Sequence, residues 1–236
     1  MSTRSSARVA LRPIHCVIAV GIALLGLAPP VRAQRNGDEL AKLSAPARAV
    51  VRATADSLDG EGLPGDALVA KAAEGLLKGA DDSRIVAAVR RLAGELRTAG
   101  AALGTGASPS EIVAAANAVH AGVSPELLRR LRAVAPAGRG DGRGEGRLTV
   151  PLVVITDLIS RGAPVGVAAE SAISLLANHA TDADLQALRA GVERDIVAGD
   201  DPRTAALARS RALADSLGNG AIRPATLPSR PPIPLP

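Results

Sequence analysis

The chain has 236 residues, 28 basic and 23 acidic side chains, and a formal net charge of +5 at pH 7. It contains one Cys and no Phe, Tyr or Trp. These counts exclude a disulfide within the chain, and they exclude the aromatic stacking platforms with which proteins commonly bind sugars and single-stranded nucleic acid.

The first 33 residues are predicted to be a cleaved signal peptide. Residues 1–15 carry three arginines and no acid, and residues 16–28 form an uninterrupted apolar run. Two prolines and then small residues follow, so we expect cleavage after Ala33 and a mature chain that begins at Gln34. The alternative is that this segment stays uncleaved as an anchor, although its apolar run is shorter than the ~20 residues that cross a bilayer as a helix.

Removing the signal peptide changes the charge balance. Four basic residues and no acidic residue precede Gln34, which leaves 24 basic against 23 acidic side chains. A nearly neutral mature chain lacks the electrostatic footprint of a nucleic-acid-binding protein, so no nucleic-acid partner is predicted. The preference for Arg over Lys, 25 against 3, and the high Ala content are typical of a GC-rich bacterial genome.

Residues 34–43 are predicted to be a linker that leads into a helical domain over residues 44–217. Its first turn, residues 60–65, reads GEGLPG and matches the dinucleotide-binding pattern G-x-G-x-x-G. A phosphate cradle needs a strand before it, whereas a helical pattern precedes this turn, and Pro64 lacks an amide N–H. We therefore predict a helix-to-helix turn and no bound cofactor.

The acidic stretch DSLDGEGLPGD, residues 56–66, superficially resembles a calcium loop. It lacks the alternating ligands at positions 1, 3 and 5 and the terminal bidentate Glu, so a solvated helix end is predicted instead. The pairs Asp81–Asp82 and Asp200–Asp201 are predicted to lie at helix starts, where carboxylates accept hydrogen bonds from unpaired amides.

The segment GASPSEIVAAANAVHAGVSPELL, residues 106–128, contains two similar helix starts. Ser108 is a candidate N-cap, Pro109 suits the first helical position, and Glu111 can complete a capping box. Ser124 begins a second start, and Gly122 stands where a left-handed residue ends the helix before it. The segment therefore predicts one short helix and the beginning of the next.

Similar phrases occur seven times along the domain. They begin at Gly62, Gly79, Gly106, Gly122, Gly162, His179 and Gly199. The first six form pairs that are 17, 16 and 17 residues apart, and successive pairs are 44 and 56 residues apart. Removing the glycine-rich segment 136–147 restores the spacing of 44, so we interpret the domain as three degenerate helical repeats with one insertion.

The insertion contains an RGD tripeptide at residues 139–141, which in an Arg-, Gly- and acid-rich loop arises easily by composition. Its alternating charges largely cancel, and a flexible linker is the preferred interpretation. The next segment, LTVPLVVITDLI at residues 148–159, is rich in β-branched residues that suit a strand. No partner strand is evident, and Pro151 suits a first helical turn, so we predict a helix.

His120 and His179 are predicted to be structural residues at helix ends. They show no metal-ligand spacing, and the mature chain has no Cys to complete a metal site. No G-x-S-x-G motif occurs, and no spacing selects a catalytic triad. The sequence therefore assigns no catalytic, cofactor-binding or metal-binding residue and favours a protein that is not an enzyme.

The complete prediction is an all-α domain of about nine short helices, arranged as antiparallel hairpins in a degenerate helical-repeat array or an irregular bundle. Residues 218–236 are predicted to be a proline-rich, disordered tail. The leading functional hypothesis is an exported, non-catalytic interaction or structural protein of the bacterial envelope, with an envelope protein as its partner. The alternative is a periplasmic small-ligand binder or enzyme with a site between repeats. No stable transmembrane segment is expected in the mature chain, and the sequence does not indicate an oligomeric state.

Overall fold

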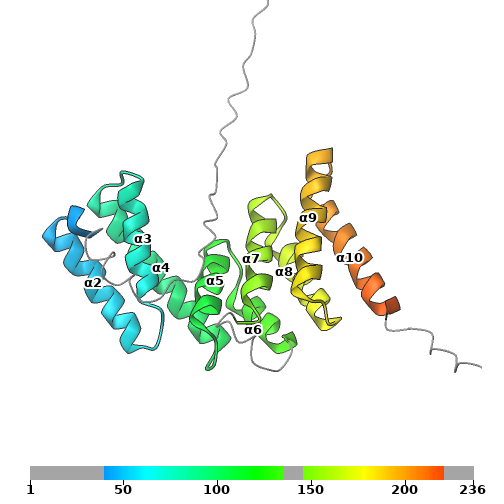
Figure 1. Cartoon of the computed structure of the whole chain (residues 1–236), viewed down its shortest axis with the longest axis horizontal. Coiled ribbons are helices and arrows are strands. Elements are labelled where there is room, and N and C mark those ends of the chain that lie inside the picture. Colours follow the sequence, from blue (N-terminus) through cyan, green and yellow to red (C-terminus); the bar gives the residue numbers. More distant parts are fainter. Residues whose placement is uncertain (1–39, 136–145, 221–236) are drawn as a thin grey trace, which may run out of the picture.

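The computed structural model describes residues 40–135 and 146–220 (Figure 1). The predicted signal peptide, most of the insertion with its RGD tripeptide, and most of the tail lie outside the described residues. The described residues form nine α-helices, one 3-10 turn and no strand, which confirms the all-α prediction. The elements are η1 (Leu40–Lys42), α2 (Ala45–Gly60), α3 (Asp66–Leu77), α4 (Asp82–Leu103), α5 (Pro109–His120), α6 (Pro125–Val134), α7 (Thr149–Ser160), α8 (Val165–Ala177), α9 (Asp182–Ala198) and α10 (Pro202–Gly220).

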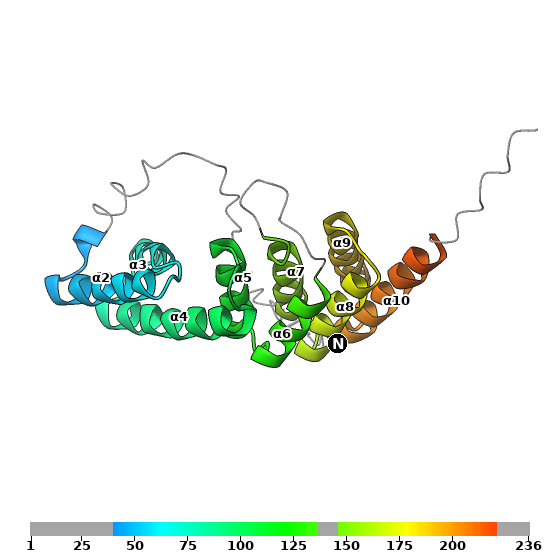
Figure 2. The same ribbon diagram turned by 90° about the horizontal axis from the view of Figure 1, so that it is seen from below.

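The helices pack in two rows. In the first row α2 packs on α4, α4 on α6, α6 on α8, and α8 on α10. In the second row α5 packs on α7 and α7 on α9, while α3 packs on α2 and α4. Figure 2 shows α4, α6, α8 and α10 along one side of the molecule and α3, α5, α7 and α9 along the other. The result is an elongated two-layer assembly, because each helix buries its apolar face mainly against its neighbours in the two rows.

Most helices begin at the polar residues that the sequence places there. Ser108 and Glu111 form the capping box predicted for α5, and the Ser124 hydroxyl accepts a hydrogen bond from the Leu127 N–H at the start of α6. A second capping box, formed by Thr181 and Asp184, begins α9. Since such caps satisfy amides that have no partner inside the helix, these boundaries are decided locally.

The helix ends follow one backbone pattern. All seven positions at which the recurring phrase begins have positive φ, from +60° at His179 to +106° at Gly199. At six of them the next residue donates its N–H to the carbonyl five residues earlier, as in Val123 to Ala118 at 2.9 Å. This is the Schellman motif, which closes a helix through a left-handed residue and explains why glycine recurs at these positions.

The core consists of small aliphatic side chains. The buried hydrophobic residues, from Leu40 to Ala206, are Leu, Ile, Val and Ala and form one cluster, with several alanines on α5 at or near zero exposure. Alanine faces let helix axes approach closely, which compensates for the missing aromatic volume. Residues 149–160 form a helix as predicted, and Leu152, Val154, Ile155 and Leu158 of that helix are all buried.

Arginine–carboxylate pairs join neighbouring helices within each row and between the two rows. Arg130 of α6 binds Glu170 of α8 in a fork, and Arg209 of α10 binds Asp195 of α9 in the same way. Asp157 of α7 accepts hydrogen bonds from Arg161 at 2.7 Å and from Arg189 of α9 at 3.0 Å. The planar guanidinium of Arg suits such bidentate and bridging contacts better than the ammonium group of Lys, so the preference for Arg over Lys fits this structure.

Of the helices within residues 40–135 and 146–220, none is long and apolar enough to cross a membrane.

Candidate functional site: a groove over α4

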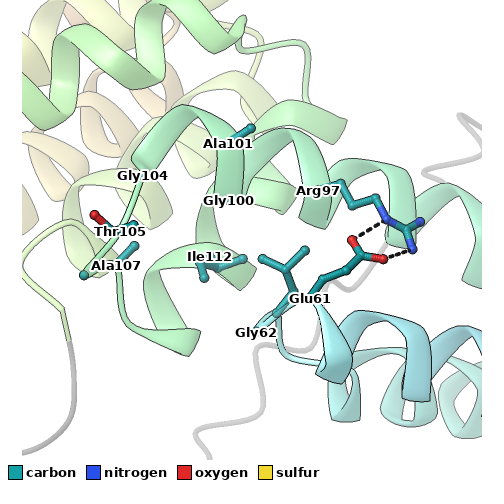
Figure 3. Close-up of a pocket in the computed structure, with 11 residues that line it drawn as sticks. Glu61, Gly62, Arg97, Gly100, Ala101, Gly104, Thr105, Ala107 and Ile112 are labelled. Atoms are coloured by element: carbon teal, nitrogen blue, oxygen red, sulfur yellow. Dashed lines mark hydrogen bonds and ion pairs between the residues drawn. The ribbon is translucent and has the colours of Figure 1, made fainter.

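The second row of helices is interrupted between α3 and α5, which make at most marginal contact with each other. The interruption leaves a groove of about 490 Å³ over the C-terminal half of α4. We call it the α4 groove, and Figure 3 shows the residues that line it. They are Glu61, Gly62, Leu63, Arg97, Gly100, Ala101, Gly104, Thr105, Gly106, Ala107 and Ile112.

The length of α4 produces this interruption. At 22 residues α4 is longer than its neighbour α6, which has 10. At 1.5 Å of rise per residue, this makes α4 about 33 Å long, enough to carry the α2–α3 hairpin on one part of its surface and α5 on another. The recurring phrases at Gly79 and Gly106 are 27 residues apart, whereas the two phrases of a pair are 16 or 17 residues apart. The wider spacing leaves room for a longer helix between them. The sequence predicted about nine short helices, and α4 is the longest of the nine that the structure describes.

Small residues form the floor of the groove. Gly100 and Ala101 lie in the last turn of α4 and Gly104 is its C-cap residue, with a φ of +73°, so all three line the groove at the C-terminal end of this helix. Leu63, from the α2–α3 turn, packs so closely on Gly100 that an added Cβ atom would lie 2.6 Å from its Cδ2 atom. Glycine at residue 100 thus lets the turn rest directly on the helix backbone. Larger side chains at these positions would fill the groove.

One ion pair supplies the charge of the groove. Arg97 Nε donates to Glu61 Oε2 at 2.8 Å and Arg97 Nη2 donates to Glu61 Oε1 at 2.6 Å, so the pair is bidentate (Figure 3). The hydrogen bond from Arg97 lowers the pKa of Glu61, and the bond to Glu61 raises the pKa of Arg97. Arg97 Nη1 has no hydrogen-bond partner among the residues that the structure describes. The wall is therefore neutral overall but keeps free donor hydrogens.

The lining of the groove is largely apolar. Its apolar surface comes from Leu63, Ile112 and two alanines, and much of the rest is glycine backbone. The hydroxyl of Thr105 is the one alcohol in the lining, and the lining contains no His, Cys or Lys to activate it. The groove can therefore hold an apolar group and offer hydrogen bonds at its edge.

The GEGLPG turn lies at the wall of this groove. It joins two helices, α2 and α3, as predicted, and Glu61 and Gly62 from it belong to the lining. Asp59, from the acidic stretch, accepts a hydrogen bond from the Gly65 N–H at 2.9 Å and so serves the start of α3. Within residues 40–135 and 146–220 no three His, Cys, Asp or Glu side chains are close enough to share a metal ion.

The two histidines occupy separate helix ends and neither lines the groove. His120 Nδ1 lies 2.7 Å from Oε1 of Glu95 on α4, a contact that joins α5 to α4. His179 ends α8 with a φ of +60°, and among the described residues it is the one non-glycine with positive φ. Both positions agree with the prediction that these histidines lie at helix ends.

The predicted aspartate pairs also lie at helix starts. The Asp81 side chain accepts a hydrogen bond from the Arg84 N–H at 2.9 Å, and Asp201 accepts one from the Thr204 N–H at 3.0 Å. The hydrogen bond from Ser83 is the larger cause of a lowered pKa at Asp81, followed by the Arg84 amide. These carboxylates cap helices and point to no paired acid–base chemistry.

Sequence reasoning missed the part of the groove that α4 contributes. Arg97, Gly100, Ala101 and Gly104 follow helical spacing, and two glycines near the end of an otherwise strong helix pattern were an available signal. The signal was insufficient, because it does not show that the neighbouring helices leave this side open.

In comparisons with known proteins, no family model, curated protein or solved structure matches this chain.

Proposed function

We propose that the chain is an exported, non-catalytic helical protein of the bacterial envelope that holds a segment of another envelope protein in the α4 groove. Export rests on the N-terminal charge and hydropathy pattern, which is typical of a signal peptide. The recurring left-handed helix ends and the two rows of helices support a degenerate repeat array as the scaffold.

The observation that carries this proposal is the uncovered surface of α4 between α3 and α5. The groove is largely apolar or glycine-lined, its one ion pair is internally neutralised, and its volume of about 490 Å³ is that of a small pocket. We therefore expect the bound segment to be short and uncharged, with one aliphatic side chain between Leu63 and Ile112.

Crosslinked affinity capture tests the proposal. Tagged mature chain, residues 34–236, would be expressed in its native envelope beside the variants Ala101→Leu and Ala190→Leu. Both alanines are exposed on helices, but only Ala101 lines the groove. We expect one specific partner to be recovered by the parent chain and by Ala190→Leu and to be lost with Ala101→Leu, provided that circular dichroism shows equal helix content. Equal recovery by both variants would refute the groove as the binding site.

A shortened chain separates the groove from the tail. A mature chain that stops at Gly220 removes the proline-rich segment and leaves α10 intact. Loss of the partner from this shortened chain, with retention by Ala101→Leu, would assign binding to the tail. Retention by the shortened chain, together with loss from Ala101→Leu, would support the groove.

The alternative function is a small-ligand binder at the same groove. The volume of about 490 Å³ lies within the usual range of small-ligand pockets, about 300–1,000 Å³. A screen of neutral aliphatic metabolites by thermal shift, with Ala101→Leu as the blocked form, would support this alternative. The supporting result is a concentration-dependent rise in melting temperature in the parent chain that the blocked form lacks.

A further inference from the structure

A buried carboxylate outside the α4 groove joins three helices. Glu111, in the first turn of α5, is 3% exposed. Its Oε2 atom accepts a hydrogen bond from the Ser108 N–H at 2.7 Å, which completes the capping box of α5. Its Oε1 atom accepts a second hydrogen bond from the Leu148 N–H at 3.1 Å, a residue 37 positions later in the chain.

The second bond serves the N-terminus of α7, which has no side-chain cap of its own. Leu148 is the N-cap residue of α7, and its side chain cannot accept a hydrogen bond. Glu111 therefore serves the N-terminal ends of two helices with one carboxylate, where the positive end of each helix dipole favours negative charge. Arg132 Nη1, from the last turn of α6, lies 3.8 Å from Glu111 Oε1 and supplies a partly exposed positive charge. These three partners offset the cost of burying the carboxylate.

The chain that returns from the insertion passes directly over this carboxylate. A Cβ atom at Gly146 would overlap the carboxyl group of Glu111, so glycine is required there for a steric reason. Thr149 Oγ1 and Ser110 Oγ lie 3.4 Å apart beside the same contact. Leu148 is fully buried between these polar contacts.

We propose that Glu111 is a latch that holds residues 146–150 against α5 and can release them while the rest of the molecule stays folded. The remainder of α7 has its own support, because Leu152, Ile155 and Leu158 are each buried to 1% exposure or less. At the start of α7 Glu111 accepts the N–H of Leu148, while the N–H of Thr149 donates to the Gly146 carbonyl at 3.1 Å, so Glu111 is the side chain that ties this short turn to α5. Release is thus a local opening that exposes Leu148 and separates residues 146–150 from α5.

Hydrogen exchange on the mature chain tests the latch with two variants that act from opposite sides. Glu111→Gln keeps the shape of the side chain but leaves one oxygen for two N–H donors, and Gly146→Ala pushes residues 146–150 away without removing the carboxylate. We expect each to raise the exchange rate of the Leu148 amide about tenfold or more, which corresponds to the loss of one buried hydrogen bond. Exchange in α9 should stay unchanged.

Matched controls isolate this effect. Gly166→Ala places a methyl group where no atom lies within 4 Å, and Glu126→Gln neutralises an exposed glutamate on α6. Both should leave exchange at residues 148–150 at the parent rate. Unchanged exchange in Glu111→Gln and Gly146→Ala would overturn the proposal. A uniform rise across α5 to α9 would also overturn it, since Glu111 would then act on global stability alone.

Discussion

His179 occupies a backbone position that glycine holds at the six other phrase starts, so replacing it with glycine should stabilise the protein. Its φ of +60° lies in the left-handed region, where a side chain costs about 1–2 kcal/mol. The imidazole is exposed and makes no hydrogen bond or ion pair with the described residues, so little is lost with it. Glycine also has more conformational entropy than His in the unfolded chain, and this cancels about 0.5–1 kcal/mol of the stabilisation gained by removing the strain.

The net expectation for His179→Gly is a rise of about 0.5–1 kcal/mol in the free energy of unfolding, or about 2 °C in melting temperature for a domain of this size. Urea denaturation followed by circular dichroism at 222 nm measures it. The midpoint should increase while the slope stays constant, because the surface exposed on unfolding does not change.

The reciprocal substitution is Gly79→His at the equivalent end of α3. Gly79 has a φ of +69°, and an added Cβ atom there would have no neighbour within 4 Å. In both turns the left-handed residue and the residue after it donate hydrogen bonds of the same length, 3.0 Å, to the preceding helix. Gly79→His should therefore lower the free energy of unfolding by about as much as His179→Gly raises it. The reasoning is refuted if His179→Gly lowers stability, or if both substitutions shift the midpoint in the same direction.

Three further predictions concern acid stability, the insertion and the core. Hydrogen bonds from Arg209 lower the pKa of Asp195, so its contribution to stability is complete above about pH 4, the ordinary aspartate range, and is lost as the pH falls through the lowered value. Melting temperatures of Asp195→Asn and the parent chain should therefore be measured between pH 2 and 7. The variant should melt at a lower temperature than the parent at neutral pH, and the two melting temperatures should become equal in acid. Replacing residues 136–145 with four Gly/Ser residues should keep helix content and move the melting temperature by less than about 2 °C, because loop closure depends weakly on length; a non-cooperative transition would contradict this. Ile155→Ala should cost about 2–5 kcal/mol in urea unfolding, whereas Val153→Ala, at a position that is 38% exposed, should cost less than about 1 kcal/mol; equal losses would contradict the assigned faces of α7.

Helix boundaries and helix type were readable from local sequence. Ser108 with Glu111, and Gly122 in the left-handed region, act through atoms within five residues of one another, so a short window contains the whole interaction. For residues 148–159, by contrast, the prediction of a helix over the β-branched propensity of the segment rested on the absence of a partner strand anywhere in the chain. The small aliphatic core likewise followed directly from a composition without aromatic residues.

The tertiary structure alone decided the features that join distant segments. The α4 groove exists because α3 and α5 rest on different parts of one long helix, and the spacing of the phrases at Gly79 and Gly106 does not show that the surface between them stays open. Glu111 looks like an ordinary capping residue in sequence, yet it also holds Leu148, 37 residues away. Local hydrogen bonds determine where helices begin and end, whereas the open surface and the buried carboxylate depend on which helices pack together, since burial is a property of the whole assembly.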